Sequence, residues 1–397
     1  MNTSERKLRI LGVVNLPWDE RLGAARTWIE LKREWEKAGH VVEKFCLTDA
    51  FPNPPKSRAG SVFQQLFFKN RVASYVRQNA SRFDVLDCLI GTLPYCKKSL
   101  GFNGLSVARS VGLFRLYDRF LRRARKIWPN QPRGRWYGPL LHRFLEWRNT
   151  EDSEAAIRFC DLIVVPNEDE RAELEQEPPL QAQIIVEPYA LSDEFREALT
   201  RAAAPADDRL SRQTVCFIGM WGPRKGSRDW SRIIATIRQS YPAATFLFLG
   251  TMVDNEVVFG DLEVTEGITC WRTFSESELP LLLSHCTVAL FPSYIEGFGL
   301  AVLEQLAAGL PTVAYDVPGP RQILAPLRDR SLVPCGDVAA LAARACAIFA
   351  SDIIAYEKLS RDGVALAAKY RWSEVASRTI EAYRTHLQSL GKGISSL

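Results

Sequence analysis

Short apolar runs alternate with longer amphipathic stretches along most of this chain of 397 residues. The predicted strands are Leu8–Asn15, His40–Leu47, Asp84–Gly91, Asp161–Pro166, Ile184–Pro188, 214–219, 244–249, 268–273, 286–292 and 312–316. Helices are predicted between them, for example at 24–38 and 62–77. Because alternation of strands and helices gives parallel sheets covered by helices on both faces, the pattern predicts an α/β fold.

The length of the chain allows two domains, each with its own hydrophobic core. The stretch from Ser192 to Gln213 is polar, rich in alanine and without a strand pattern, so we expect a linker at 191–212. The prediction is two doubly wound domains, 1–190 and 213–372, followed by a last helix at 373–397.

Composition excludes several classes of protein. Hydrophobic residues make up 47% and charged residues 24% of the chain, as in ordinary globular domains. The nine cysteines contain no C-x-x-C pair and the four histidines form no zinc pattern. No apolar run approaches the ~18 residues of a membrane span, and no signal peptide is predicted. We therefore expect a cytoplasmic protein with reduced thiols and no metal or other cofactor.

Two carboxylates flank a glycine-bearing turn in the second half of the chain. Val288–Phe291 is predicted to be a buried strand, and a helix is predicted from about Leu300. A glycine-bearing loop that enters a helix leaves backbone N–H groups free for an anion such as phosphate. Glu304 lies on an otherwise apolar helix, where a carboxylate is costly unless a ligand bonds to it. The layout predicts a nucleotide-sugar site, with Glu296 on the sugar and Glu304 on the ribose hydroxyls.

A second segment carries cations that suit the same ligand. A strand ends at Gly219, whose small size allows a tight turn, and Arg224 and Lys225 follow in the loop. A pair of cations beside a diphosphate stabilises the charge that develops on it as it leaves. A solvated basic turn is the alternative interpretation of this segment.

The segment from Pro292 to Pro311 reads PS-x-x-EGFGL-x-x-LE-x-x-A-x-G-x-P. It resembles the E-x7-E signature of retaining GT-B glycosyltransferases of the family 4 type. The resemblance covers most of the chain and is densest from about 212 to 330. It implies two doubly wound Rossmann-like domains facing across a cleft, the second for the nucleotide-sugar and the first for the acceptor, with the last helix crossing back onto the first.

The resemblance also assigns roles in the second domain. Lys225 matches the lysine of the family's G-R-x-x-x-x-K-G loop, whereas the family's arginine falls on Met220, so Arg224 is the candidate to replace it. Lys225, Arg224 and the N–H groups around Phe298, Gly299 and Leu300 would then assist departure of the diphosphate. Arg321, after the strand at 312–316, would reach the donor sugar or else face water.

Matches to the family in the first domain are less complete. Gly23 resembles the family's N-terminal glycine-rich loop, although its second glycine is Ala24 here, and an ordinary helix start is the alternative. The segment Gly104–Gly112 is similar to a family strand that ends in a histidine facing the sugar. Val111 occupies that position, and Arg109, beside Ser110, is the candidate substrate-binding residue in its place.

The segment 109–148 is strongly basic. Eleven arginines and lysines stand against Asp118 and Glu146, and apolar residues recur at helical spacing. Trp128, Trp136 and Trp147 lie in or beside this pattern. A basic amphipathic stretch with aromatic residues suits an anionic membrane surface or a lipid-linked acceptor, and a solvated helix face is the alternative.

Together these features predict a hexosyltransferase-like enzyme that transfers sugar from a nucleoside-diphosphate sugar to a glycan or lipid-linked acceptor. The resemblance implies retention of configuration without a divalent metal, and the chain contains no D-x-D motif. Two alternatives share the fold. One is a nucleotide-sugar epimerase, which would use more histidines than this chain has. The other is a non-catalytic nucleotide-sugar binder, which the departures at Met220, Ala24 and Val111 leave open. A nucleic-acid binder acting through 109–148 ranks last, because no RNA or DNA module accompanies the basic stretch.

Overall fold

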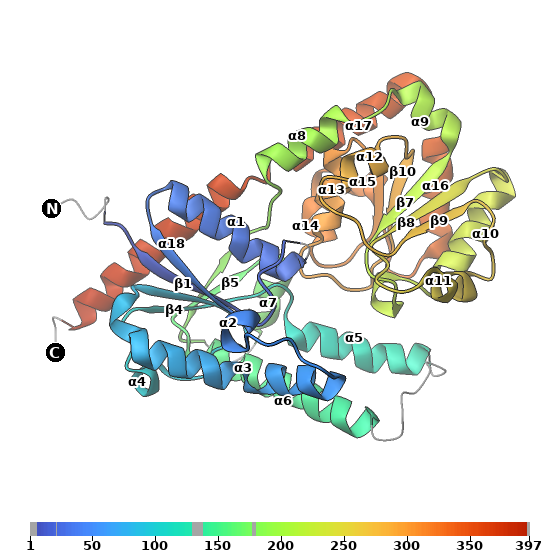
Figure 1. Cartoon of the computed structure of the whole chain (residues 1–397). Coiled ribbons are helices and arrows are strands. Elements are labelled where there is room, and N and C mark those ends of the chain that lie inside the picture. Colours follow the sequence, from blue (N-terminus) through green and yellow to red (C-terminus); the bar gives the residue numbers. More distant parts are fainter. Residues whose placement is uncertain (1–5, 21, 129–137, 177–179, 395–397) are drawn as a thin grey trace. The chain divides into compact units, whose positions relative to one another are not determined.

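The computed structural model describes residues 6–20, 22–128, 138–176 and 180–394 (Figure 1). The chain divides into two compact units: unit 1 comprises Met1–Tyr189 and Trp372–Leu397, and unit 2 comprises Ala190–Arg371. Each unit contains one six-stranded sheet of parallel strands with helices between the strands. The predicted fold class, two Rossmann-like α/β domains, is therefore confirmed.

The sheet of unit 1 has the strand order β2-β1-β3-β4-β5-β6. Its strands are β1 (Arg9–Val14), β2 (Val41–Cys46), β3 (Val85–Leu89), β4 (Leu105–Arg109), β5 (Leu162–Val165) and β6 (Gln183–Val186). Its helices are α1 (Gly23–Lys37), α2 (Leu47–Ala50), α3 (Arg58–Asn79), α4 (Lys97–Leu100), α5 (Phe114–Ile127), α6 (Gly138–Phe159), α7 (Glu168–Glu175) and α18 (Trp372–Ile394), with a 3₁₀ turn at Ala80–Arg82.

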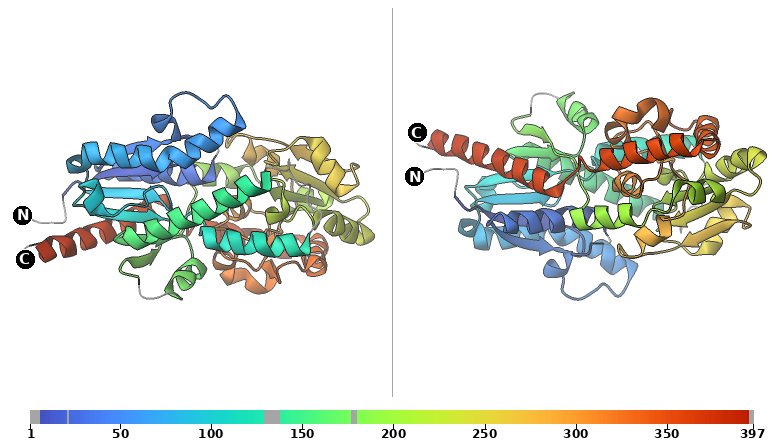
Figure 2. Two further views of the ribbon diagram at one scale, coloured as in Figure 1. Left: turned by 90° about the horizontal axis from the view of Figure 1, so that it is seen from below. Right: turned by 90° about the horizontal axis from the view of Figure 1, so that it is seen from above.

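The last helix of the chain packs within unit 1. In Figures 1 and 2, α18 runs beside α1, the first helix. The indole of Trp35 on α1 donates a hydrogen bond to the carbonyl oxygen of Ala376 at 3.3 Å, and its ring lies 6.0 Å from that of Tyr383. Both aromatic rings are buried, so α1 and α18 contribute to the same hydrophobic core of unit 1.

The sheet of unit 2 has the order β12-β11-β10-β7-β8-β9. Its strands are β7 (Thr214–Ile218), β8 (Thr245–Leu249), β9 (Ile268–Trp271), β10 (Val288–Phe291), β11 (Thr312–Tyr315) and β12 (Leu332–Val333). Its helices are α8 (Asp193–Arg201), α9 (Ala206–Arg212), α10 (Trp230–Ser240), α11 (Asn255–Leu262), α12 (Leu279–Leu283), α13 (Leu300–Ala307), α14 (Pro320–Ile323), α15 (Arg328–Ser331), α16 (Val338–Phe349) and α17 (Ile353–Ala367), with 3₁₀ turns at Pro223–Lys225 and Ala325–Leu327.

This order reverses the direction of winding between β7 and β10. In open parallel sheets of this kind, ligands bind beyond the carboxyl ends of the strands at the reversal. A core of aromatic side chains supports this part of the sheet: the ring of Trp230 lies 4.8 Å from Phe248 and 5.5 Å from Phe217, in edge-to-face contacts. Such contacts add to the hydrophobic stabilisation that burial of each ring supplies.

The ten predicted strands are all present, most of them with trimmed ends. β4 lies within the segment 104–112 that the family resemblance identified, and β12, with only two residues, is too short to leave a pattern. The segment expected to be a linker, 191–212, instead contains α8 and α9 and falls within unit 2. Phe195 and Leu199 are buried at a spacing of four, so α8 packs as an amphipathic helix.

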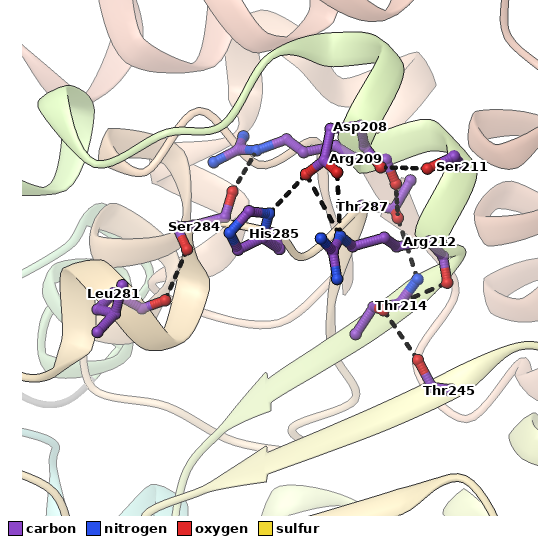
Figure 3. Close-up of polar contacts among 10 residues, drawn as sticks. All are labelled: Asp208, Arg209, Ser211, Arg212, Thr214, Thr245, Leu281, Ser284, His285 and Thr287. Atoms are coloured by element: carbon purple, nitrogen blue, oxygen red, sulfur yellow. Dashed lines mark hydrogen bonds and ion pairs between the residues drawn. The ribbon is translucent and has the colours of Figure 1, made fainter.

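Arg209 on α9 joins the carboxyl ends of two helices of unit 2. Its guanidinium donates to the carbonyl oxygen of Ser284, which ends α12, at 2.8 Å (Figure 3). It also donates to the carbonyl oxygens of Ala308 at 2.8 Å and Gly309 at 3.1 Å, which end α13. The last carbonyl groups of a helix lack partners within the helix, so a buried cation at this position satisfies them and complements the helix dipole.

Among the described residues, a test of length and hydropathy finds no single helix able to cross a membrane. The consecutive helices α16 and α17 pass that test only as a pair, and they are bent by 119° at the break between them.

Replacing Arg209 is expected to destabilise unit 2. Arg209→Met removes the side-chain donor from the carbonyl groups of Ala308 and Gly309, and leaves that of Ser284 with only the N–H of Ala204, so it should lower the free energy of unfolding by about 3 kcal/mol. Urea unfolding followed by circular dichroism measures this loss. The control is Arg201→Met on the neighbouring α8. The side chain of Arg201 is 80% exposed, and its ion pair with Glu197 is long, at 4.0 Å. That change should cost less than about 0.5 kcal/mol, and equal losses in the two variants would refute the capping role of Arg209.

Candidate active site

Three loops of unit 2 meet at the carboxyl ends of β7, β10 and β11. The backbone N–H of Tyr294, after β10, donates to the carbonyl oxygen of Arg224, after β7, at 2.9 Å. Gly226 has a φ of +81°, and a Cβ atom there would overlap the carbonyl oxygen of Pro292. Gly319, after β11, has a φ of +84° and lies equally close to the carbonyl oxygen of Phe298. Since only glycine combines this conformation with so close an approach, the sequence requires both residues for the loops to meet.

The meeting of the loops brings three predicted residues together. The Nζ atom of Lys225 lies 2.5 Å from Oε1 of Glu296, and a guanidinium nitrogen of Arg224 lies 3.6 Å from the same oxygen. Lys225 also lies over the ring of Phe291, 4.8 Å from its centroid. Only 7% of Glu296 is exposed. A carboxylate so buried requires a counter-charge, and the two cations supply it.

The environment of Lys225 disfavours its charged form. Burial lowers the pKa of the Lys225 ammonium, the Glu296 carboxylate opposes this shift, and the Arg224 guanidinium adds to it. The Glu304 carboxylate also acts on Lys225 and raises its pKa, so the ammonium lies within electrostatic reach of both predicted carboxylates. A further anion near Lys225 would therefore be bound favourably.

Glu304 lies within α13, between residues that are fully buried. Gly299, with a φ of +94°, precedes the helix and offers no side chain to cap its first N–H groups. The N-terminus of α13 is therefore open to an anion supplied by a ligand. Glu304 is 8% exposed, whereas its neighbours Leu303 and Gln305 are completely buried.

Two other predicted residues of unit 2 have structural contacts. The Nε atom of Arg321 pairs with Oδ1 of Asp316 at 2.5 Å, and Arg328 pairs with Oδ2 of the same carboxylate at 3.0 Å. The ring of Phe298 points into the protein, 3% exposed and 5.8 Å from the ring of Tyr370. Arg321 thus stabilises the loop after β11. Because the ring of Phe298 is buried, only the backbone of this residue can contribute to the candidate site.

The prediction for Arg109 in unit 1 needs correction. Arg109 has no exposed surface, and its guanidinium pairs with Oδ2 of Asp87 at 2.7 Å and bonds to the hydroxyl of Tyr383 at 3.0 Å. A residue enclosed in this way supports the end of β4 and does not face a substrate. This pairing could not be predicted from local sequence, because Asp87 lies on the neighbouring strand β3.

Gly23 is the exposed first residue of α1. A Cβ atom there would meet nothing within 4 Å, and the residue does not have a positive φ. The backbone therefore has no need of glycine at this position, as expected of an ordinary helix start. Val111, at the position of the family's histidine, packs with Val14 and Trp28 in an apolar cluster.

The structure adds residues that the sequence analysis did not single out. Asp229 accepts hydrogen bonds from two tyrosines beside the loops of the candidate site. In unit 1, Glu170 is completely buried and accepts hydrogen bonds from the Ser110 hydroxyl at 2.6 Å and from the N–H of Leu113 at 3.3 Å. Burial raises the pKa of Glu170 to about 8. In the sequence, Glu170 is one of three consecutive acidic residues and nothing distinguishes it from the other two.

The basic segment 109–148 is partly neutralised by ion pairs. Arg115 pairs with Glu154 at 2.7 Å and Arg119 pairs with Glu173 at 2.5 Å. Of the residues that defined the segment, Arg133, Arg135 and Trp136 lie outside the described residues, as do the side chains of Arg143 and Glu146. Over the described parts of the chain, no group of three or more His, Cys, Asp or Glu side chains is placed to hold a metal ion.

Comparison with known proteins finds similarity within unit 2. Residues 212–351 match the model of the family described as glycosyl transferases group 1. The chain is 27% identical over 175 residues to the phosphatidyl-myo-inositol mannosyltransferase of Mycobacterium leprae strain TN. That match covers 44% of this chain and 46% of the relative, so the chain spans less than half the length of that protein.

Solved structures resemble almost the whole chain. Sucrose-phosphate synthase from Thermosynechococcus elongatus aligns with a TM-score of 0.72 and 17% identity, over 97% of this chain and 100% of that one. HepE from Anabaena, in complex with UDP and glucose, aligns with a TM-score of 0.66 and 14% identity, over 95% of this chain and 100% of that one. These likenesses show the fold, two Rossmann-like domains of the GT-B class.

The buried carboxyl group of Glu170 should make the stability of the protein depend on pH. Its folded-state pKa of about 8 lies above the ordinary value of 4.5, so its contribution is full below pH 4.5 and is lost as the pH rises toward 8. Glu170→Gln keeps the shape without the titration. As the pH rises from 5 to 8, the free energy of unfolding of the variant should therefore increase by about 2–4 kcal/mol relative to that of the wild type.

Urea unfolding at several pH values measures this gain. Glu168→Gln, at an exposed position of the same helix, serves as the control and should follow the wild-type curve. If Glu170→Gln runs parallel to wild type across the range, Glu170 does not titrate as the structure predicts.

Proposed function

We propose that the protein is a glycosyltransferase that moves a sugar from a nucleoside-diphosphate sugar to an acceptor in glycan, polysaccharide or glycolipid synthesis. The observation that carries the proposal is the arrangement of Lys225, Arg224 and Glu296 beside the open N-terminus of α13, at the strand-order reversal of unit 2. The family match over 212–351 supports it. Each element suits one part of a nucleotide-sugar.

In this proposal, the diphosphate binds where two sources of positive potential meet. The N–H groups that follow Gly299 and the Lys225 ammonium stabilise the negative charge that develops as the diphosphate departs. Without ligand, Lys225 pairs with Glu296 at 2.5 Å. A bound diphosphate attracts Lys225, and the Glu296 oxygens then accept hydrogen bonds from the sugar hydroxyls. Glu304, further along the same helix, accepts from the ribose hydroxyls.

The finer assignment follows the family 4 resemblance. We infer that the transfer retains the configuration at the anomeric carbon, with the acceptor attacking from the face that the diphosphate leaves, and that no divalent metal takes part. Comparing the anomeric configuration of donor and product by NMR tests retention, and assays with and without EDTA test the metal independence.

A lipid-linked acceptor is the favoured partner because exposed aromatic side chains lie on α6 and exposed cations lie on α5. Phe144 and Trp147 on α6 are 43% and 56% exposed, and their rings lie 5.9 Å apart. Arg123 and Lys126 on α5 are exposed cations that lie near the end of their helix. Aromatic side chains beside cations bind the interface of an anionic bilayer. The proposal therefore places the protein in the cytoplasm, peripheral to the inner face of the membrane.

Nucleotide binding is expected to stabilise the protein against heat. Nucleotides at about a hundred times their dissociation constant add roughly 2.7 kcal/mol, so a thermal-shift panel of UDP, GDP, ADP, CMP and their common sugars will reveal the donor class. Glu304→Ala should abolish most of the shift. Glu357→Ala, an exposed carboxylate on α17, is the control and should retain it. A cooperative melt that no nucleotide moves would refute the proposal, and binding without turnover would favour a non-catalytic binder.

Membrane contact is expected to depend on lipid charge and on the exposed aromatic residues. The wild type should sediment with vesicles that contain phosphatidylglycerol and stay in solution with pure phosphatidylcholine. Phe144→Ser combined with Trp147→Ser should reduce the bound fraction severalfold. The control is Leu281→Ser, which removes a side chain that is 75% exposed in unit 2. Equal binding by both variants, or equal binding to both vesicles, would exclude this surface.

A further inference from the structure

A buried carboxylate lies behind the candidate active site and is shared by two tyrosines. Asp229 immediately precedes α10 and is 5% exposed. Its Oδ2 atom accepts a hydrogen bond from the hydroxyl of Tyr294 at 2.9 Å and another from the hydroxyl of Tyr315 at 2.7 Å. The two rings pack edge to face, with centroids 5.5 Å apart. A buried carboxylate needs such donors, and burial raises the pKa of Asp229 while both hydroxyl bonds oppose that shift.

Tyr294 connects Asp229 to the loop that carries Glu296. It lies two residues before Glu296, and its backbone N–H donates to the carbonyl oxygen of Arg224 at 2.9 Å. Its hydroxyl reaches Asp229 in the segment that leads from Lys225 into α10. Tyr294 is thus held at both its backbone and its side chain by the segment that presents the two cations to Glu296.

Tyr315 makes the same kind of bond from a different place. It is the last residue of β11 and is held in the sheet by pairing with Val333 of β12. It is completely buried, and the strand backbone fixes its position without help from its hydroxyl. Loss of either hydroxyl removes one donor from the same oxygen atom, but only Tyr294 belongs to the loop of Glu296.

We propose that Asp229 and Tyr294 are positioning residues for Glu296. The bond from the Tyr294 hydroxyl to the Asp229 carboxylate fixes the loop 292–296, so that Glu296 meets the Lys225 ammonium in the free protein and the donor sugar in the complex. The part of this inference that concerns the sugar rests on the proposed function, and the part that concerns Lys225 does not.

The first experiment separates binding of the sugar from binding of the nucleotide. Calorimetry gives the affinities of Tyr294→Phe and Tyr315→Phe for UDP, UDP-glucose, GDP and GDP-mannose. Tyr294→Phe should weaken binding of the preferred nucleotide-sugar by about tenfold and leave binding of its free nucleotide unchanged. Tyr315→Phe, the matched control, should change neither affinity. Glu296→Gln should reproduce the pattern of Tyr294→Phe.

Replacement of Asp229 distinguishes positioning from a general loss of structure. Asp229→Asn keeps an oxygen that can accept both hydroxyls and should retain most of the selectivity for the sugar. Asp229→Ala keeps no acceptor and should behave like Tyr294→Phe. Unfolding experiments should give similar losses of stability for the two tyrosine variants, so stability alone does not account for the difference between them.

The second experiment needs no ligand. Acetylation of Lys225 by acetic anhydride, followed by mass spectrometry, reports how firmly Glu296 holds the ammonium, with the exposed Lys358 of the same unit as reference. Tyr294→Phe should raise the relative rate at Lys225 severalfold, and Tyr315→Phe should not.

The outcomes separate the two proposals. If the wild type binds none of the four probes and no nucleotide of the thermal-shift panel, the proposed function fails, and the acetylation rates still test the positioning of Glu296. If the tyrosine variants change sugar binding and Lys225 reactivity equally, or change neither, the positioning role of Tyr294 and Asp229 is overturned.

Discussion

The reversal of strand order between β7 and β10 determines where the chemistry of unit 2 lies. Loops that leave neighbouring parallel strands in opposite winding directions diverge to the two faces of the sheet, and they leave room at the point of divergence. Here that place is occupied by the two loops that carry Lys225 and Glu296, and the loop after β11 closes against them through Gly319. The ion pair, the open helix terminus and the tyrosine pair all depend on this one feature of the topology.

The Lys225–Glu296 pair combines two buried charges at the candidate site. Burying either charge alone would cost desolvation free energy, and the attraction between the two charges offsets that cost. The charged form of Lys225 is nevertheless only partly compensated, because burial lowers the pKa of its ammonium group and the Arg224 guanidinium lowers it further. An anionic ligand relieves this imbalance. The protein therefore keeps, in its free state, a cation whose interactions improve when the proposed diphosphate binds.

The sequence predicted the elements that follow a simple periodicity and the residues that lie next to each other on one loop. The ten predicted strands belong to the first group, and Arg224 and Lys225, adjacent on the loop after β7, belong to the second. The ion pair of Lys225 with Glu296 joins two different loops and was not predicted. Arg109 shows the limit: its partner Asp87 lies 22 positions away on the neighbouring strand, and nothing local distinguishes a paired arginine from a substrate-binding one. Asp229 was missed for the same reason, because its tyrosines lie 65 and 86 positions along the chain. The stretch at 191–212 was misleading because its alanine-rich composition conceals the two apolar residues that pack α8.

The contacts of Arg209 have a mechanical consequence for the site. By holding the carbonyl groups of Ala308 and Gly309 at the end of α13, and that of Ser284 at the end of α12, this side chain fixes the far end of the helix whose near end receives an anion in the proposed function. A helix fixed at one end does not slide or rotate easily when a charge arrives at the other. In the proposed function, the response to a ligand then comes from side chains, above all the four-carbon side chain of Lys225, while Glu304 stays in place. On this view α13 keeps its position, and the side chains around it adjust to the ligand.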